Sequence, residues 1–253
     1  MTLRKILVPI AAMIVFLGLW ELLVWANDWP NYVMASPSDL PPAYARFWNL
    51  FLIMGWQTLW RTVVGLLIAI VVGVLLGMIM GFSRTMRDAL YPLLVGFNAI
   101  PKATVVPIVA LLFVGAHDFN TILIAFMISF FPIAVSVSIG LSTLEPEYRD
   151  ILRSLGASQT TIFWKIALPK TLPEFFGALK VAVTLAFIGT NLMEIVSPHG
   201  RGLGALFDSG KTNSDYPLMF AVLIALAFLG IVLYYVVVAL EKVFAGWAER
   251  QPH

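Results

Sequence analysis

Residues 62–82 read TVVGLLIAIVVGVLLGMIMGF, a run of 21 residues without a charged side chain. A helix that crosses the hydrocarbon core of a bilayer needs about 20 mostly apolar residues. The composition of the whole chain agrees, because 60% of its 253 residues are hydrophobic and only 12% are charged. Soluble globular chains carry about 25% charged residues. The sequence therefore predicts an all-α integral membrane protein.

Five further stretches are long and apolar enough to cross a membrane. The six predicted spans are 6–26, 59–82, 90–113, 119–141, 175–197 and 216–240, within a single domain of residues 1–253. The first stretch could instead be a signal peptide, because Arg4 and Lys5 precede it. It is long for the apolar part of a signal, and no small-residue cleavage site follows closely, which favours an uncleaved anchor helix.

The positions of Lys and Arg orient the six spans. With both chain ends on one side, that side holds eleven of the sixteen Lys and Arg residues. Cytoplasmic loops carry an excess of positive charge. We therefore expect both termini in the cytoplasm of a multi-pass protein of the bacterial inner membrane, with one large cytoplasmic loop at 143–174. The outer side receives residues 27–58 and 198–215.

Several classes of function are disfavoured by composition. The chain has no cysteine and only three widely separated histidines, so we expect no disulfide, metal site or cofactor. A net charge of +2 predicts no nucleic-acid surface. The spans contain no pair of carboxylates and no nucleophile–base set, which argues against an intramembrane enzyme. Residues 205–212 (ALFDSGKT) match a relaxed P-loop, but no strand precedes them, so we expect no nucleotide site there.

Small residues recur at every fourth position of the second predicted span. They are Gly65, Ala69, Gly73, Gly77 and Gly81. Residues four apart lie on one helix face, and small side chains allow helices to approach closely in lipid. The pattern predicts a tight helix–helix contact, with a sliding or gating surface as the alternative.

Polar side chains within the spans are candidates for lining a translocation pathway. The candidates are Asn98, Pro101, Lys102, Ser129, Ser136, Asn191 and Glu194. An ionisable residue inside a membrane is a functional candidate by default. The alternatives are that 90–113 forms two short helices, that the serines bond between helices, and that Glu194 is an ordinary interfacial carboxylate. Asn98 and Lys102, four residues apart, are expected to share one helix face.

The predicted cytoplasmic loop contains two short helices. Glu147–Leu155 is amphipathic, and Gly156 suits its end. Ser158 can cap a second helix over Gln159–Ala167 that ends before Pro169. The pair would lie beneath the membrane and offer a surface to a partner, although an interfacial helix without a partner has the same pattern.

The loop resembles that of permease subunits of binding-protein-dependent ABC importers. Their motif is E-A-A, three residues, G, nine residues and I-x-L-P. Here Asp150-Ile151-Leu152 is followed by Gly156 and by Ile166-Ala167-Leu168-Pro169 with the same spacing. Asp150 replaces the glutamate, and Ile151 and Leu152 replace the alanines. Residues 90–113, Phe130-Phe131-Pro132 and Glu194 with Gly200-Arg-Gly-Leu-Gly204 look like the nitrate/sulfonate/taurine-type branch.

The resemblance implies a type I ABC importer permease, with six transmembrane helices and a coupling helix between the fourth and the fifth. Its partners would be a second copy, a cytoplasmic ATPase dimer, an extracytoplasmic solute-binding protein and membrane lipid. The permease would not itself be an enzyme. The residues expected to couple to the ATPase are Glu147, Arg149, Asp150, Arg153, Gly156, Ala157, Ser158, Ile166, Leu168 and Pro169.

The expected cargo is a small solute such as nitrate, a sulfonate, taurine or a vitamin precursor. Lys102 and Arg201 would suit an anion; uptake of a labelled anion that is unchanged by Lys102→Ala would refute this hypothesis. A stand-alone secondary transporter or channel is the alternative function. It predicts coupling carboxylates within the spans, where only Glu194 is available, and it leaves the loop at 143–174 unexplained.

Overall fold

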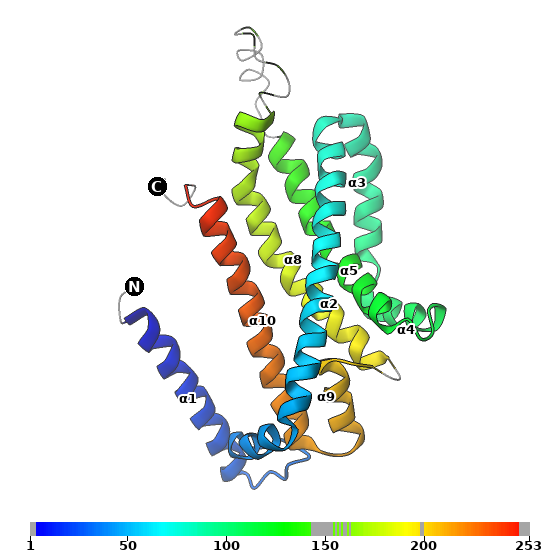
Figure 1. Ribbon diagram of the computed structural model, residues 1–253. Coiled ribbons are helices and arrows are strands. Elements are labelled where there is room, and N and C mark those ends of the chain that lie inside the picture. The colour runs from blue at the N-terminus through cyan, green and yellow to red at the C-terminus, as the bar shows by residue number, and fades with distance from the viewer. Residues whose placement is uncertain are drawn as a thin grey trace.

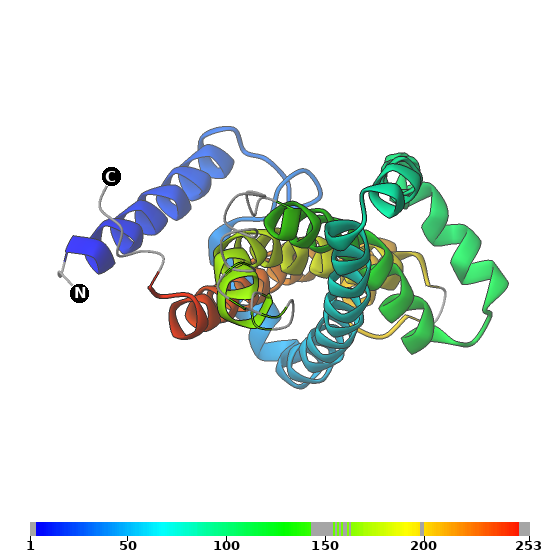
Figure 2. The ribbon, with the colours of Figure 1, turned by 90° about the horizontal axis from the view of Figure 1, so that it is seen from above.

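The computed structural model describes residues 4–142, 154, 156, 158, 161, 163–197 and 200–247. The regular structure of these residues is helical. The elements are α1 (Arg4–Ala26), η1 (Pro37–Asp39), α2 (Leu40–Phe82), α3 (Arg84–Ala99), α4 (Lys102–Leu112), α5 (His117–Ser142), the π-helix η2 (Phe163–Ala167), α8 (Leu168–Val196), α9 (Leu203–Thr212) and α10 (Tyr216–Phe244). Helices α2, α5, α8 and α10 form the central bundle, and α1 and α4 project from opposite sides of it (Figures 1 and 2).

Four helices are long and apolar enough to cross a membrane, among the residues that the structure describes. They lie at Pro37–Phe82, His117–Ser142, Lys165–Val196 and Tyr216–Phe244. Helices α3 and α4 pass the same test only as a pair, bent by 85°. The predicted span 6–26 lies on α1, where the apolar stretch Ala11–Ala26 is shorter. Each predicted span thus falls on a helix or on the bent pair.

Helix α2 is much longer than the predicted span 59–82. Its 43 residues begin at Leu40, with one non-helical residue, Phe47. Helix α2 therefore covers residues 40–58, more than half of the segment 27–58 that is predicted as an outer connection. The reason is local. Pro41 and Pro42 fall in the first turn, where a missing N–H is tolerated, and no further proline follows within the helix.

The third predicted span is broken sharply between α3 and α4. Ile100 and Pro101 have extended backbones with ψ of 126° and 110°. Helix α3 lies beside α2, while α4 turns away from the bundle (Figure 1). The expectation that 90–113 forms two short helices is therefore confirmed, while the role of this stretch in a pathway stays a prediction. The expectation that Asn98 and Lys102 share one helix face is wrong, because the extended residues between them end the helical periodicity.

The small-residue ladder of α2 packs against α5. A Cβ added at Gly65 would lie 2.6 Å from the Cβ of Ala125, and one at Gly77 would lie 2.6 Å from the Cβ of Val137. Real Cβ atoms do not approach so closely, so these positions require glycine. The predicted tight helix contact is confirmed.

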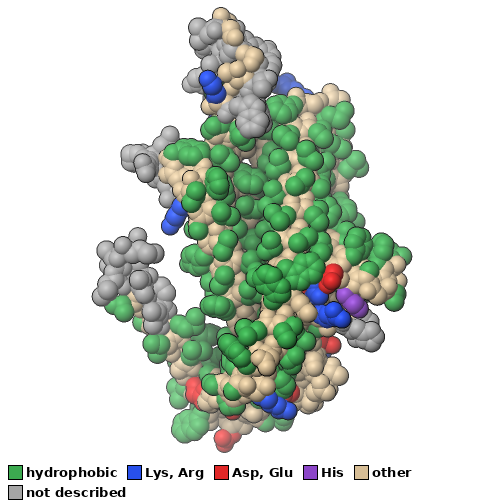
Figure 3. Space-filling view, viewed as in Figure 1, with side chains coloured by type: hydrophobic (Ala, Val, Ile, Leu, Met, Phe, Trp, Pro, Cys, Tyr) green, Lys and Arg blue, Asp and Glu red, His purple; other side chains and the backbone are tan. Residues whose placement is uncertain are grey.

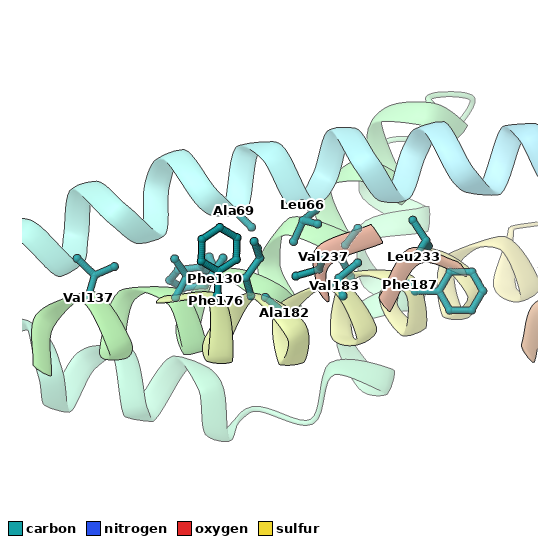
Figure 4. Close-up of a cluster of buried hydrophobic side chains, with 14 of the residues drawn as sticks. Leu66, Ala69, Phe130, Val137, Phe176, Ala182, Val183, Phe187, Leu233 and Val237 are labelled. Atoms are coloured by element: carbon teal, nitrogen blue, oxygen red, sulfur yellow. The ribbon is translucent and has the colours of Figure 1, made fainter. Parts of the chain in front are cut away.

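The main core lies where α2, α5, α8 and α10 meet. Figure 4 shows Leu66, Phe130, Val183 and Leu233 from these four helices turned towards one another. The outer surface of the bundle is also apolar, since hydrophobic side chains cover most of the face in Figure 3. Such a surface suits a bilayer, because the apolar side chains face lipid. The helices satisfy their own backbone hydrogen-bonding groups, which lipid cannot do.

Candidate functional site

The most unusual side chain of the structure is Arg61, a charged residue of α2 that is only 2% exposed. Its Nη2 and Nε lie 2.6 and 2.8 Å from Oδ1 of Asp118, at the start of α5. Its Nη1 lies 3.2 Å from Oε1 of Glu194, near the end of α8, and also donates to the carbonyl oxygen of Arg201. A buried guanidinium needs such partners, because an unpaired buried charge is very costly.

Glu194 is equally buried, with 1% of its surface exposed. The hydroxyl of Thr58 donates to its Oε2 over 2.8 Å, and the backbone N–H of Gly204 donates to the same oxygen over 3.1 Å. The Thr58 oxygen also accepts the N–H of Leu203 over 2.9 Å. The carboxylate thus receives donors from α2 and from the first turn of α9, where a negative charge suits the helix dipole.

The glycine-rich segment before α9 is shaped around this carboxylate. Gly202 has a φ of +120°, and a Cβ there would overlap the Glu194 carboxyl group. A Cβ at Gly204 would lie 2.7 Å from the Cβ of Glu194. Only glycine permits this approach and this backbone conformation. The stretch Gly200–Gly204 is therefore a binding loop for a carboxylate of the same chain.

Further hydrogen bonds extend the network between helices. The hydroxyl of Thr62 on α2 donates to that of Thr190 on α8 over 2.9 Å, and both side chains are buried. Nδ1 of His117 lies 2.7 Å from Oγ of Ser197. We define the charge network as Thr58, Arg61, Asp118, Glu194 and the backbone of residues 201–204. It joins α2, α5, α8 and α9 at one end of the bundle, called the α9 end below.

Sequence reasoning selected Glu194 but missed Thr58, Arg61 and Asp118. A signal was available at the start of the predicted span 59–82, since Arg61 and Thr62 lie three and four residues after Thr58 and would share one helix face with it. Arg61 and Glu194 are 133 residues apart in the sequence, so no pattern of neighbouring residues indicates that they pair.

The predicted pathway residues are not gathered into one site. Asn98 and Pro101 are exposed near the α3–α4 break, and Ser136 is half-buried on α5. Ser129 is buried and donates to the carbonyl of Ala125 in its own helix, and Asn191 donates to that of Phe187 in the same way. Their role in a pathway stays a prediction.

Lys102 has a structural partner at the break. Its Nζ donates to the carbonyl oxygen of Phe97 over 2.5 Å and lies 4.5 Å from the centre of the Phe97 ring. A cation is favourable at a helix C-terminus. Lys102 therefore completes the end of α3 in this conformation.

Much of the predicted coupling loop lies outside the described residues. Those coupling candidates are Glu147, Arg149, Asp150, Arg153 and Ala157. Gly156 has a φ of +83°, a conformation that favours glycine. Oγ of Ser158 accepts the N–H of Thr161 over 3.2 Å, which is the geometry of a helix cap.

The second loop helix does not end before Pro169, as had been predicted. Instead η2 runs directly into α8, and Pro169 occupies the first turn of α8. A proline is tolerated in a first turn. Ile166, Leu168 and Pro169 are half-buried there. Helix α8 consequently begins at Leu168, within the predicted loop 143–174, and is continuous to Val196.

Comparison with known proteins points to one family. The profile described as "Binding-protein-dependent transport system inner membrane component" matches residues 69–247. The riboflavin transport system permease protein RibX of Chloroflexus aurantiacus is 34% identical over 245 residues, covering 94% of this chain and 89% of that protein. The nitrate import permease protein NrtB of Leptolyngbya laminosa is 27% identical, covering 88% and 82%.

A solved structure shares the fold. The MetNI methionine ABC transporter in an inward-facing conformation matches with a TM-score of 0.65 and 19% identity, over 78% of this chain and 96% of that one. At this identity the likeness concerns the fold, which is that of a type I importer permease.

Proposed function

Because the chain belongs to the family of inner membrane components of binding-protein-dependent transport systems, we propose that it forms the path by which a small solute, delivered by a solute-binding protein, enters the cell. The family match over residues 69–247 carries this proposal. The chain is the membrane permease of an ABC importer and not an enzyme, since the ATPase of such importers is a separate subunit. We further propose a homodimer of permeases on an ATPase dimer.

The solute is a small polar molecule. The similar permeases are named for riboflavin and for nitrate, which range from a vitamin to an inorganic anion. The permease framework therefore serves chemically different cargoes. We propose that the solute-binding protein selects among these cargoes. Sulfonates and taurine lie within the same range of small polar solutes.

Helix α8 is the proposed mechanical link between ATP and the pathway. It runs without interruption from Leu168, next to the coupling loop, to Val196, next to Glu194. At 1.5 Å per residue its 29 residues span roughly 43 Å. A displacement of the loop by the ATPase would therefore reach the α9 end through one rigid element. ATP drives transport only by favouring one of two states through differential binding.

The coupling loop supplies the proposed contact with the ATPase. The positive φ of Gly156 and the cap at Ser158 support a turn between two short helices. We place this loop and both termini in the cytoplasm and the α9 end outside. The proposal includes the motif residues Asp150, Ile166 and Leu168 as parts of the docking surface.

A pull-down that compares two substitutions of Gly156 tests the contact. Gly156→Val places a β-branched side chain at positive φ, which costs about 1–2 kcal/mol. Gly156→Asn also adds a side chain, but asparagine tolerates this conformation. We expect Val to reduce the ATPase that co-purifies from the native host by roughly tenfold, since 1.4 kcal/mol is a factor of ten, and Asn to reduce it less.

Membrane insertion, measured by the amount of permease in washed membranes, is the control for both variants. If wild-type protein brings down no ATPase, the importer proposal fails and a stand-alone transporter replaces it. If Gly156→Val and Gly156→Asn both leave the amount of co-purified ATPase unchanged, the turn at Gly156 is not part of the contact with the ATPase.

A further inference from the structure

Helix α9 depends on the charge network for its position. It has ten residues, which is too short for a helix to be stable in isolation. The backbone N–H groups of Leu203 and Gly204, in its first turn, end on Thr58 and Glu194. Just before the helix, the carbonyl of Arg201 accepts from Arg61. Three backbone groups around the start of α9 are thus satisfied by side chains of α2 and α8.

The apolar side of α9 adds a second, non-directional attachment. Leu203 and Leu206 are 2% and 3% exposed and pack in a cluster with Phe51 of α2 and Val222 of α10. Apolar packing alone permits small slides of a short helix, because it has no preferred direction. The hydrogen bonds to the network remove that freedom, since donors and acceptors must stay aligned.

The network also joins helices that are distant in sequence. Arg61 contacts Asp118 at the start of α5 and Glu194 at the end of α8 in one buried cluster. Both charges of the Arg61–Glu194 pair are buried, so separating them would leave each without compensation. The α9 end is therefore a part of the structure that resists opening.

We propose that Arg61 and Glu194 are positioning residues for transport, which hold α9 and its glycine-rich loop as a fixed part of the outer end throughout the transport cycle. The outward orientation of α9 and its role in transport rest on the proposed function, whereas the attachment of α9 does not. Glu194 then acts as a tether for α9, so that α9 keeps its contacts with α2 and α8 and moves together with them when the ATPase displaces α8.

Single-cysteine labelling tests the attachment, because the chain has no cysteine of its own. Leu206→Cys places a thiol on the buried side of α9, and Ser209→Cys places one on its exposed side. The double variant Arg61→Met/Glu194→Met removes both buried charges at similar volume. We expect it to raise the rate of maleimide labelling at position 206 by roughly tenfold, since Gly204 loses its acceptor, with little change at position 209.

A control removes a partly buried ion pair elsewhere in the bundle, whose side chains are 25% and 16% exposed. Nζ of Lys180 lies 2.8 Å from Oε2 of Glu241, between α8 and α10. The double variant Lys180→Met/Glu241→Met should leave labelling at position 206 unchanged. If the Arg61/Glu194 double variant fails to insert, Glu194→Gln, which keeps the shape and one carbonyl acceptor, is measured instead and should raise the rate by a smaller factor.

The second arm follows the wild-type contacts during ATP turnover. In the purified complex with its ATPase, labelling of Leu206→Cys should be equally slow with and without ATP. If labelling at position 206 stays slow in the Arg61/Glu194 double variant or in Glu194→Gln, the tether is overturned. If ATP accelerates labelling of the otherwise wild-type Leu206→Cys protein, the constant attachment of α9 during the cycle is overturned. If no ATPase co-purifies, the proposed transport function fails, and the first arm still decides whether the network holds α9.

Discussion

At the scale of single residues, the main feature is a buried pair of opposite charges, Arg61 and Glu194, in a chain whose helices are mostly apolar. Arg61 and Glu194 are each at most 2% exposed, and their mutual contact is supported by Asp118 and Thr58. Such a group is stable only as a set, because removing one member leaves another unpaired in a region of low dielectric. The set therefore explains why a polar cluster persists in a chain that is otherwise adapted to lipid.

Gly202 offers a test of the carboxylate loop. In Gly202→Ala, the new methyl group would overlap Glu194 and would sit at a φ of +120°. We expect a loss of about 1–3 kcal/mol in stability, the usual cost of overpacking, seen as a lower thermal unfolding midpoint in detergent. Gly55→Ala is the control, since a Cβ there meets its nearest heavy atom, from Leu203, only at 3.9 Å. Equal midpoints for the two variants would contradict the loop geometry.

At the scale of helices, α2 and α5 form the most extensive contact among the described elements. The ladder of small residues brings the two backbones together, and the neighbours of Gly73 and Gly77 include carbonyl oxygens of α5. Backbone atoms cannot rotate away as side chains do, so the contact tolerates little change. Close backbone approach is the main source of stability between helices in lipid, where the hydrophobic effect between helices is absent.

Gly77→Ala should therefore weaken the α2–α5 pair. A Cβ at this position would lie 2.7 Å from the carbonyl oxygen of Ala134. We expect a destabilisation of about 1–3 kcal/mol, measured by thermal unfolding of the solubilised permease. Gly177→Ala on α8 is the matched control, because a Cβ there meets no heavy atom within 4 Å. That control should be neutral or slightly stabilising, since alanine favours a helix by about 0.5–1 kcal/mol. The reverse order of the two variants would refute the packing role of the ladder.

At the scale of the whole molecule, the two ends of the bundle have different tasks. One end carries the charge network and α9, and the other carries the turn between α2 and α3 and the start of α8 (Figure 1). Helix α8 connects them. In the proposed importer, these ends face the solute-binding protein and the ATPase respectively.

The orientation of the molecule can be measured in intact cells. Ser209→Cys lies on the exposed side of α9, and Ser154→Cys lies at an exposed position in the predicted cytoplasmic loop. The excess of Lys and Arg on the loop side predicts that this side is cytoplasmic. We expect a membrane-impermeant maleimide to label position 209 in intact cells and position 154 only after permeabilisation. The opposite pattern would invert the topology and remove the ATPase contact.

The sequence by itself determined the class of the protein, most of its helices and its family resemblance. These properties are local: a run such as 62–82 is apolar wherever it lies, and the spacing from Asp150 through Gly156 to Pro169 is counted along the chain. The glycine ladder also predicted its own packing, since helical periodicity alone sets its face.

Only the tertiary structure decided where the charged groups go. Arg61, Asp118 and Glu194 come from three helices, and each alone reads as an ordinary interfacial charge. The 85° angle of the break before α4 and the continuity of α8 through Pro169 are likewise visible only in the structure. The physical reason is that hydropathy and helical period depend on neighbours in the chain, whereas the stability of a buried charge depends on neighbours in space.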